Sequence, residues 1–254
     1  FLISLILIRL FYLIFVDEVK IKISNDLIQD DFQDLINNNI QILVVTGFYQ
    51  DKNCDKFINN INNINKSGII PKKWSLGGGK YFDVNIYQKP LSDYFNNLCS
   101  LDEYIKQDDI ISEFISGIDH PFKNLVKNIK NYKIKVGCDP VLGFGIEKKY
   151  QDFLVRVYEK SNIFGEGLKH VDTDDTGLYN KYKLFSMNIY LNNFDGGELK
   201  YWKNIFKKIM YKPMKGDLII INPCYYHSVL PVQSRRISVQ SFLLVCGDNI
   251  YIRN

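Results

Sequence analysis

Short runs of β-branched and aromatic residues dominate the chain from about residue 150 onward. Each run is bounded by Gly, Asn, Asp or Pro, and no helical pattern lies between the runs. Apolar runs of this kind, separated by turn residues, are typical of antiparallel strands. The runs are DFLVRVYE (152–159), YKLFSMNIYLN (182–192), GELKYW (197–202), GDLIIINP (216–223), HSVLPV (227–232) and RRISVQSFLLV (235–245). Their succession predicts an antiparallel sandwich or a jelly roll.

The first half of the chain has a different pattern, in which apolar residues repeat at helical spacing. The run IQILVVTGF (40–48) predicts a buried strand, and helical faces follow in 51–64 and 122–129. These faces consist of Phe57, Ile58, Ile61 and Ile64, and of Phe122, Leu125, Val126 and Ile129. His120 precedes Pro121, which suits a first helical turn, so we interpret His120 as a helix-start residue without chemistry.

These patterns predict an α+β fold in which the helices pack on one side of a β core. A chain of 254 residues is long enough for one large domain or two small ones. We find no internal repeat and no linker. We therefore expect a single domain over 17–254, with a helical part at about 40–150 and a jelly-roll core at about 150–246.

Charge and cysteine content narrow the function classes. The net charge of +4 is spread along the chain without a long Lys/Arg run, so no nucleic-acid partner is expected. The five cysteines are scattered and form no CxxC pair, a pattern typical of free thiols in a reducing compartment. They are Cys54, Cys99, Cys138, Cys224 and Cys246.

The first 16 residues, FLISLILIRLFYLIFV, are apolar except for Arg9. This segment is short for a membrane span, which needs about 20 apolar residues. Its possible interpretations are a clipped membrane anchor, a signal-peptide core and translated sequence outside the protein. We expect a cytoplasmic protein, with a membrane-anchored form through residues 1–16 as the alternative.

The chain has only three histidines, and one of them lies in the acidic segment GEGLKHVDTDD (165–175). In an extended segment, residues two apart point to the same face, so His170 and Asp172 can bind one ion together. An acidic surface turn is the alternative, because the motif alone is weak. His227 is the third candidate ligand. Two histidines and one carboxylate leave open positions on the ion, as in non-haem Fe(II) oxygenases, whereas a structural zinc site is closed by four ligands.

An arginine and a hydroxyl follow His227 on the last predicted strand. Arg236 stands nine residues after His227, and Ser238 lies on the same strand face as Arg236. A guanidinium beside a hydroxyl suits a carboxylate, which it binds through two parallel hydrogen bonds. Arg235 points the opposite way and is expected at a solvated strand end.

This arrangement resembles that of the Fe(II)/2-oxoglutarate-dependent dioxygenases, and within them the prolyl-4-hydroxylase-like branch. The family pattern His-x-Asp … His … Arg-x-Ser/Thr is similar to His170, Asp172, His227, Arg236 and Ser238 in order and spacing. FSMNIYLNNFDGGELKYW, KPMKGDLIIIN and VVTGFYQDKNCDKFI also look like family segments. The resemblance covers roughly 40–246 and is most specific in 153–242. It implies a double-stranded β-helix (jelly-roll) core and a single dioxygenase domain over 17–254.

The resemblance also implies roles for individual residues. His170, Asp172 and His227 would be the iron ligands, and Arg236 would hold the distal carboxylate of 2-oxoglutarate. The other co-substrate-binding candidates are Ser238, Tyr190 and Tyr158, with Ser186 on the same strand face as Tyr190; a core tyrosine is the alternative for Tyr158. The implied cofactors and co-substrates are Fe(II), 2-oxoglutarate and O₂, with ascorbate as a further candidate.

The implied reaction is hydroxylation of an unactivated C–H bond with release of succinate and CO₂. Its substrate would be a peptidyl or free amino acid or a small metabolite. Related halogenases have a small residue at the position of Asp172, so a carboxylate there favours hydroxylation. The arginine-threonine segment of proline-modifying relatives is not evident in WSLGGGKYFDVNIY (74–87), so proline is not indicated. The rival functions are an inactive jelly-roll binding module and a cupin-like enzyme that uses another divalent metal and does not need Arg236.

Overall fold

The computed structural model describes residue 4 and residues 18–66, 72–76, 82–86, 112–138, 140, 152–160, 169–172, 181–204 and 207–253. Within these ranges the strands form a ten-stranded and a three-stranded sheet. The large sheet contains β1 (Ile21–Ser24), β2 (Ile42–Val45), β3 (Lys72–Leu76), β4 (Phe82–Ile86), β5 (Lys133–Val136), β6 (Leu154–Tyr158), β7 (Lys183–Tyr190), β10 (Leu218–Ile221), β12 (Arg236–Cys246) and β13 (Asn249–Arg253). The small sheet contains β8 (Leu199–Trp202), β9 (Lys208–Tyr211) and β11 (Tyr226–Val229). The helices are α2 (Gln29–Ile36), α3 (Asp51–Lys66) and α7 (Lys123–Asn128).

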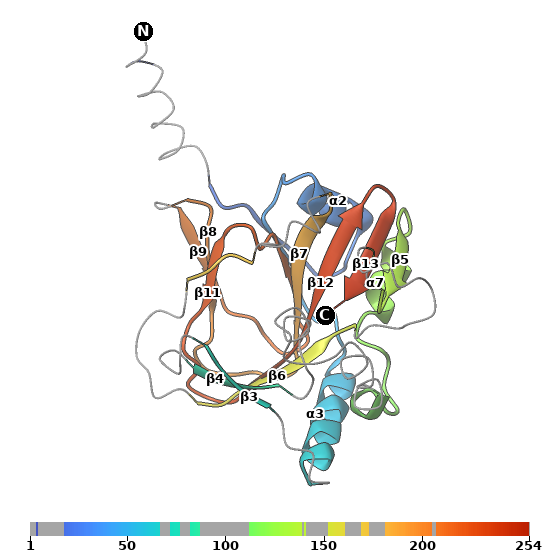
Figure 1. The fold of residues 1–254 in the computed structure, drawn as a ribbon, viewed down its shortest axis with the longest axis vertical. Coiled ribbons are helices and arrows are strands. Elements are labelled where there is room, and N and C mark those ends of the chain that lie inside the picture. The colour runs from blue at the N-terminus through green and yellow to red at the C-terminus, as the bar shows by residue number, and fades with distance from the viewer. Residues whose placement is uncertain are drawn as a thin grey trace.

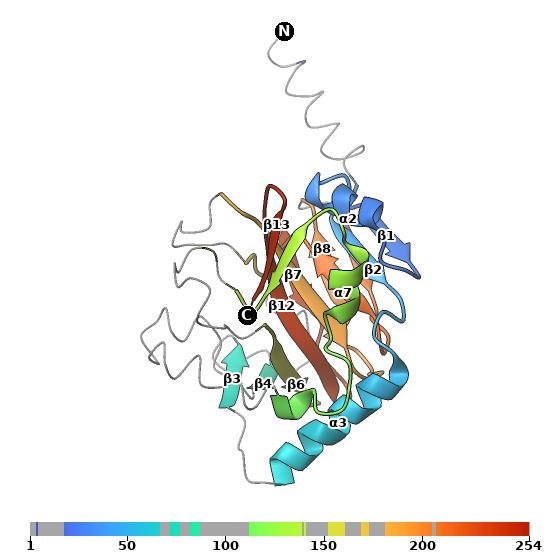
Figure 2. The same ribbon diagram turned by 90° about the vertical axis from the view of Figure 1, so that its right-hand side faces the viewer.

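The long strand β12 organises the large sheet. It pairs antiparallel with β7 on one side, and with β6 and then β13 on the other. The order continues outward as β1-β2-β10-β7 and as β6-β4-β3, and β5 runs parallel to β13. The small sheet lies opposite, and the helices cover the other side of the large sheet (Figure 1). Figure 2, turned by 90°, shows α2, α7 and α3 running across that outer face.

Side chains of the central strands alternate between the two faces of the large sheet, as the pleat of a strand requires. On β12, Ile237, Val239 and Leu243 belong to the apolar cluster beneath the helices. Arg236 and Gln240 line a cavity on the opposite face, between the two sheets. One face of the large sheet therefore packs on the main hydrophobic core, and the other contributes charged and polar side chains to the wall of the cavity.

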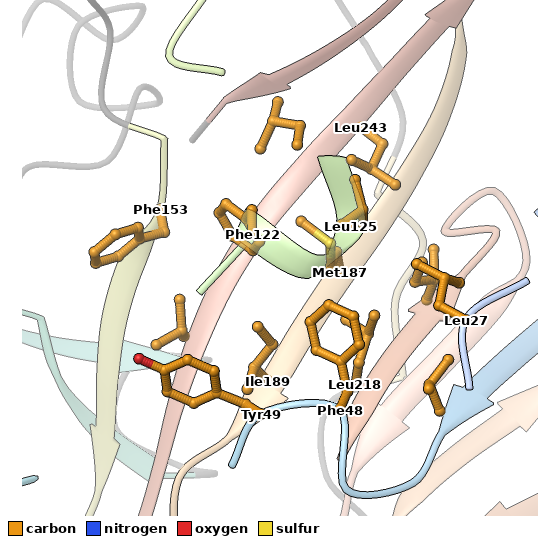
Figure 3. Close-up of a cluster of buried hydrophobic side chains, with 14 of the residues drawn as sticks. Leu27, Phe48, Tyr49, Phe122, Leu125, Phe153, Met187, Ile189, Leu218 and Leu243 are labelled. Carbon is orange, nitrogen blue, oxygen red and sulfur yellow. The ribbon is translucent and has the colours of Figure 1, made fainter. Parts of the chain in front are cut away.

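Helices and sheet share one hydrophobic core. Figure 3 shows Phe122 and Leu125 from the α7 region lying beside Met187 of β7 and Leu243 of β12. On α3, the fully buried Phe57 stacks on Phe114 with ring centroids 5.7 Å apart. Burial of this aromatic surface fixes the helices against the sheet and holds the cavity wall in place.

The structure confirms the predicted fold class and each of the predicted strands in the second half of the chain. The predicted strand 40–48 is the buried β2, and the helical face of 51–64 is the buried face of α3. On the α7 segment the prediction was wrong for Val126, whose exposed fraction is 43%. The sequence patterns did not predict β1, β3, β4, β5, β9 and β13.

The remaining sequence predictions concern the termini and the thiols. Cys54, Cys138, Cys224 and Cys246 are free, as predicted, and Cys99 lies outside the described residues. Within the described part of the chain, no helix is long and apolar enough to cross a membrane. Apart from residue 4, the segment 1–16 lies outside that part.

Candidate functional site

The backbone brings His170, Asp172 and His227 together. His170 and His227 form an isolated antiparallel bridge, in which each amide N–H donates to the carbonyl of the other residue. The amide N–H of Asp172 donates to the carbonyl of Pro223. These bonds fasten the His-x-Asp segment to the start of β11, so the three side chains meet although 57 positions separate His170 from His227 in the sequence.

The three side chains form a compact set of metal-ligand atoms. One possible ligand atom from each residue lies within 4.8 Å of the other two. Among the described residues, this is the only group of three or more His, Cys, Asp or Glu side chains that could hold a metal ion. Nε2 of His170 and Nε2 of His227 each lie 3.5 Å from a carboxylate oxygen of Asp172. The side chain of His227 is only 7% exposed, against 38% for His170 and 30% for Asp172. The cluster therefore lies where the buried cavity meets solvent.

A backbone hydrogen bond selects the nitrogen of His227 that faces the cluster. Nδ1 of His227 lies 3.0 Å from the carbonyl oxygen of Tyr225, which can only accept a hydrogen bond. A proton on Nδ1 would be donated to this carbonyl, and the contact orients the ring so that Nε2 lies on the side of Asp172. Metal-binding histidines are commonly oriented in this way.

The Asp172 carboxyl remains ionised although it is largely buried. Burial raises the pKa of Asp172, but hydrogen bonding and attraction by His227, together with His170 and Arg156, outweigh burial and hold the pKa below its usual range. An ionised carboxylate beside two imidazoles is a suitable ligand set for a first-row divalent cation.

A second cluster, in the same cavity, surrounds Arg236. This side chain is buried, and its guanidinium carbon lies 4.1 Å from the ring centre of Tyr158, 5.5 Å from that of Tyr190 and 5.7 Å from that of Phe194. Nη1 donates a long hydrogen bond of 3.4 Å to the carbonyl of Gly197. Among the described residues Nε has no hydrogen-bond partner, and none of them forms an ion pair with Arg236. A buried cation without a carboxylate is costly, so an anion bound beside Arg236 would stabilise this cluster.

The predicted co-substrate-binding residues lie around this cation on three adjacent strands. Tyr158 pairs directly with Arg236, and Tyr190 pairs with Ser238 across β7 and β12. Tyr158, Tyr190 and Ser186 line the cavity, which has a volume of about 170 Å³. Ser238 is fully buried, and its hydroxyl has no hydrogen-bond partner among the described residues.

Arg156 is a cavity residue that the sequence analysis did not single out. It lies on β6, two positions before Tyr158, and both side chains line the cavity. Burial raises the pKa of Tyr158, but the charges of Arg156 and Arg236 and a hydrogen bond from Arg156 outweigh it, so the pKa lies below its usual value. The alternation of strand 152–159 already placed residues 156 and 158 on one face, and this was the signal that could have identified Arg156.

Arg235 lies on the opposite face, as the alternation predicted. Its side chain is 37% exposed, and Nε lies 3.4 Å from a carboxylate oxygen of Glu159. It therefore has no part in the cavity and provides a matched control for Arg236.

His120 does not join the metal-ligand cluster. Its Nδ1 accepts a hydrogen bond from the amide of Phe122, so Nε2–H donates to the Asp152 carboxylate, 2.6 Å away. The Asp152 side chain is only 2% exposed. The position of His120 just before α7 agrees with the predicted helix start, and its side chain supports the fold.

Replacing His120 with alanine should therefore lower the free energy of unfolding by about 1–3 kcal/mol, because it leaves the buried carboxylate of Asp152 without its donor. Urea denaturation would measure this loss. Metal affinity of the folded variant should not change, whereas His170→Ala should show the reverse: weak metal binding with little loss of stability. Weakened metal binding in His120→Ala would contradict this division.

Comparison with known proteins agrees with this geometry. The family model of the 2OG-Fe(II) oxygenase superfamily matches residues 155–244, the segment that holds both clusters. No curated protein matches the chain. Among solved structures, the chain is similar to an N-substituted L-amino acid dioxygenase from Burkholderia ambifaria AMMD, in complex with alpha-KG. The identity is 15% and the TM-score 0.55, over 89% of this chain and 91% of that one. At this identity the likeness shows a shared fold.

Two further solved structures carry prolyl hydroxylase names. A prolyl hydroxylase from Trichoplax adhaerens, in complex with a hypoxia inducible factor oxygen degradation domain peptide fragment, is 16% identical, with a TM-score of 0.48 over 84% of this chain and 86% of that one. A prolyl-4-hydroxylase from Pseudomonas putida is 14% identical, with a TM-score of 0.46 over 87% of this chain and 99% of that one.

Proposed function

We propose that this chain, whose segment 155–244 matches the family model of the 2OG-Fe(II) oxygenase superfamily, is such an oxygenase and hydroxylates an unactivated C–H bond of a peptidyl or free amino acid or a small metabolite. In this proposal His170, Asp172 and His227 hold Fe(II), and Arg236 holds the distal carboxylate of 2-oxoglutarate. The observation that carries it is one cavity lined both by the ligand cluster and by a buried arginine without an acidic partner among the described residues.

The ligand cluster fits a catalytic iron better than a structural metal. Two imidazoles and one carboxylate leave coordination positions for other ligands, as oxygenase chemistry requires. A structural zinc site would be closed by four ligands, often thiolates. The described residues place no cysteine in the ligand cluster, although burial and then the Asp172 carboxylate raise the pKa of the Cys224 thiol.

The Arg236 cluster fits a small dicarboxylate. The planar guanidinium can bind a carboxylate through two hydrogen bonds, and its Nε is among the atoms without a partner in the described part of the chain. The Ser238 hydroxyl is buried on the same strand face and also lacks such a partner. A cavity of about 170 Å³ is smaller than the roughly 300–1,000 Å³ that pockets for drug-sized ligands occupy, which suits a small co-substrate.

When bound, Fe(II) and 2-oxoglutarate supply the oxidative chemistry, which consumes O₂ and forms succinate and CO₂. The chain supplies the geometry and the dry environment for that chemistry. Tyr158 and Tyr190 cover the guanidinium of Arg236 and keep water from it, which strengthens its attraction for a carboxylate. The ionised Asp172 supplies the negative charge of the ligand set.

The two rival functions explain the ligand cluster and the buried Arg236 less well. A cupin-like enzyme with another divalent metal needs the ligand cluster but no buried arginine. An inactive binding module needs neither an ionised Asp172 nor an oriented His227. The proposed dioxygenase accounts for both clusters at once.

Formation of succinate from 2-oxoglutarate tests the three functions in one assay. Purified protein would be supplied with Fe(II), 2-oxoglutarate and O₂, and screened with peptides, amino acids and small metabolites. The proposal expects succinate that requires Fe(II) and increases with a substrate. Turnover of a substrate without 2-oxoglutarate would favour the cupin-like enzyme, and binding of both cofactors without any succinate would favour the inactive module.

A further inference from the structure

We propose that Gln240 and Asn188 form an amide-binding subsite that determines which primary substrate the cavity accepts. The substrate class would be uncharged amides with an apolar group beside the amide. Such an amide is either a peptide group or the carboxamide of a small molecule. This inference rests on the proposed function, because it assumes that 2-oxoglutarate is bound at Arg236.

The side chain of Gln240 carries a buried polar atom that faces the cavity. Gln240 is only 6% exposed and lines the same cavity as Arg236, which lies four residues earlier on the same face of β12. Among the described residues, Oε1 of Gln240 has no hydrogen-bond partner. A buried polar group without a partner is unfavourable, so a ligand that supplies the missing hydrogen bond would be bound more tightly.

A second carboxamide lies beside that of Gln240. Asn188 on β7 is directly opposite Gln240 on β12, and it is half-buried and also lines the cavity. Residues directly opposite in an antiparallel pair have Cβ atoms about 4.5–5.5 Å apart, so the two side chains are neighbours. A carboxamide has a donor end and an acceptor end. A ligand amide offers one of each and suits this pair, whereas an ester or a carboxylate lacks the N–H donor.

The register of the large sheet divides the cavity wall into a charged and an uncharged part. The charged part lies in the rows of Arg236 and Ser238, to which Tyr158, Arg156 and Tyr190 belong. In the next two rows the residues that line the cavity are uncharged: Gln240, Asn188 and Ile219, and then Phe242, Ser186 and Ile221. A mostly apolar wall with a few polar side chains suits an uncharged ligand whose amide is flanked by apolar groups.

The length of β12 separates this subsite from the co-substrate cluster. Gln240 lies four residues after Arg236, which is about 13 Å further along the strand at about 3.4 Å per residue. The four C–C bonds of 2-oxoglutarate, each about 1.5 Å long, span at most about 6 Å. A molecule of 2-oxoglutarate held at Arg236 therefore ends before the row of Gln240, and the amide pair is left to the primary substrate.

Matched amides and esters provide the experiment. We would load the protein anaerobically with Fe(II) and 2-oxoglutarate and measure binding of each compound by calorimetry. One arm compares N-acetyl-L-amino acid N-methylamides with the corresponding methyl esters, in which an oxygen replaces the N–H. The other arm compares aliphatic primary carboxamides with their methyl esters. The first arm reports recognition of a peptide group, and the second reports recognition of a small-molecule carboxamide.

In at least one arm we expect an amide that binds about 5- to 100-fold more tightly than its ester, because the ester leaves a buried acceptor without its donor. Gln240→Leu, of similar size, should remove this preference and leave the affinity for 2-oxoglutarate within about twofold. Asn188→Ala should reduce the preference in the same direction. Gln233→Leu is the matched control and should keep the preference, because Gln233 is exposed and lies outside the cavity.

Three outcomes would overturn the inference. One is the absence of an amide-over-ester preference in both arms, whether or not the compounds bind. Another is a preference that persists in both Gln240→Leu and Asn188→Ala. The third is a large loss of 2-oxoglutarate affinity in Gln240→Leu with Fe(II) binding intact, which would make Gln240 a co-substrate residue. Failure of 2-oxoglutarate to bind the unmodified protein would instead contradict the proposed function, and titration of the Fe(II)-loaded protein alone would then decide the amide preference.

Discussion

Asp172→Ala should abolish hydroxylation and weaken Fe(II) binding by more than about 100-fold, since loss of even an outer-shell partner of a metal ligand costs about 10- to 100-fold. The change removes the anionic member of the ligand cluster and leaves the two histidines. It also removes the carboxylate that lies 3.5 Å from each of the two histidine nitrogens. Anaerobic titration with Fe(II) and the succinate assay would measure the two effects.

The control for this prediction is another carboxylate. Asp195 is a suitable choice because its side chain is 81% exposed and lies outside the cavity, so Asp195→Ala should keep both iron binding and activity. Some halogenation by Asp172→Ala with added chloride would support the ligand role, because it would place a halide where the carboxylate was. Full hydroxylase activity with unchanged iron affinity would refute the metal assignment.

The ligand cluster and Arg236 could be predicted from the sequence, because the period of an extended segment or strand determines where their side chains point. In an extended segment His170 and Asp172 share a face, and in a strand Arg236 points inward when Arg235 points outward. The structure has both arrangements. Periodicity also placed Ser186 on the strand face of Tyr190, which the family resemblance had indicated, and both residues line the cavity.

The surroundings of these residues could not be predicted in the same way, because they depend on contacts between distant segments. The cage around Arg236 includes Phe194 and the carbonyl of Gly197, which lie about 40 positions away in the chain. The pairing of β5 with β13 joins residues about 116 positions apart. Hydrophobic patterns indicate the strand face on which a residue lies but not the residues that it contacts. The pattern therefore placed Arg156 on a strand, but it could not predict that Arg156 lies near Asp172.

Arg236→Ala should raise the concentration of 2-oxoglutarate needed for half-saturation by a factor on the order of 30 to several thousand. Truncation of one partner of a buried charge pair costs about 2–5 kcal/mol, which corresponds to that range. Iron binding should persist, because Arg236 belongs to a different cluster from His170, Asp172 and His227. Arg236→Lys should recover only part of the affinity, since an ammonium cannot form the two parallel hydrogen bonds of a guanidinium.

The neighbouring Arg235 tests whether the position of the arginine matters as well as its charge. Arg235 carries the same side chain one residue earlier, but it is partly exposed and pairs with Glu159. An exposed ion pair of this kind contributes at most about 1 kcal/mol. Arg235→Ala should therefore change little when 2-oxoglutarate is titrated against each Fe(II)-loaded variant. If Arg235→Ala were the damaging change and Arg236→Ala harmless, the carboxylate would bind on the other face of β12, and the cavity could not be the co-substrate site.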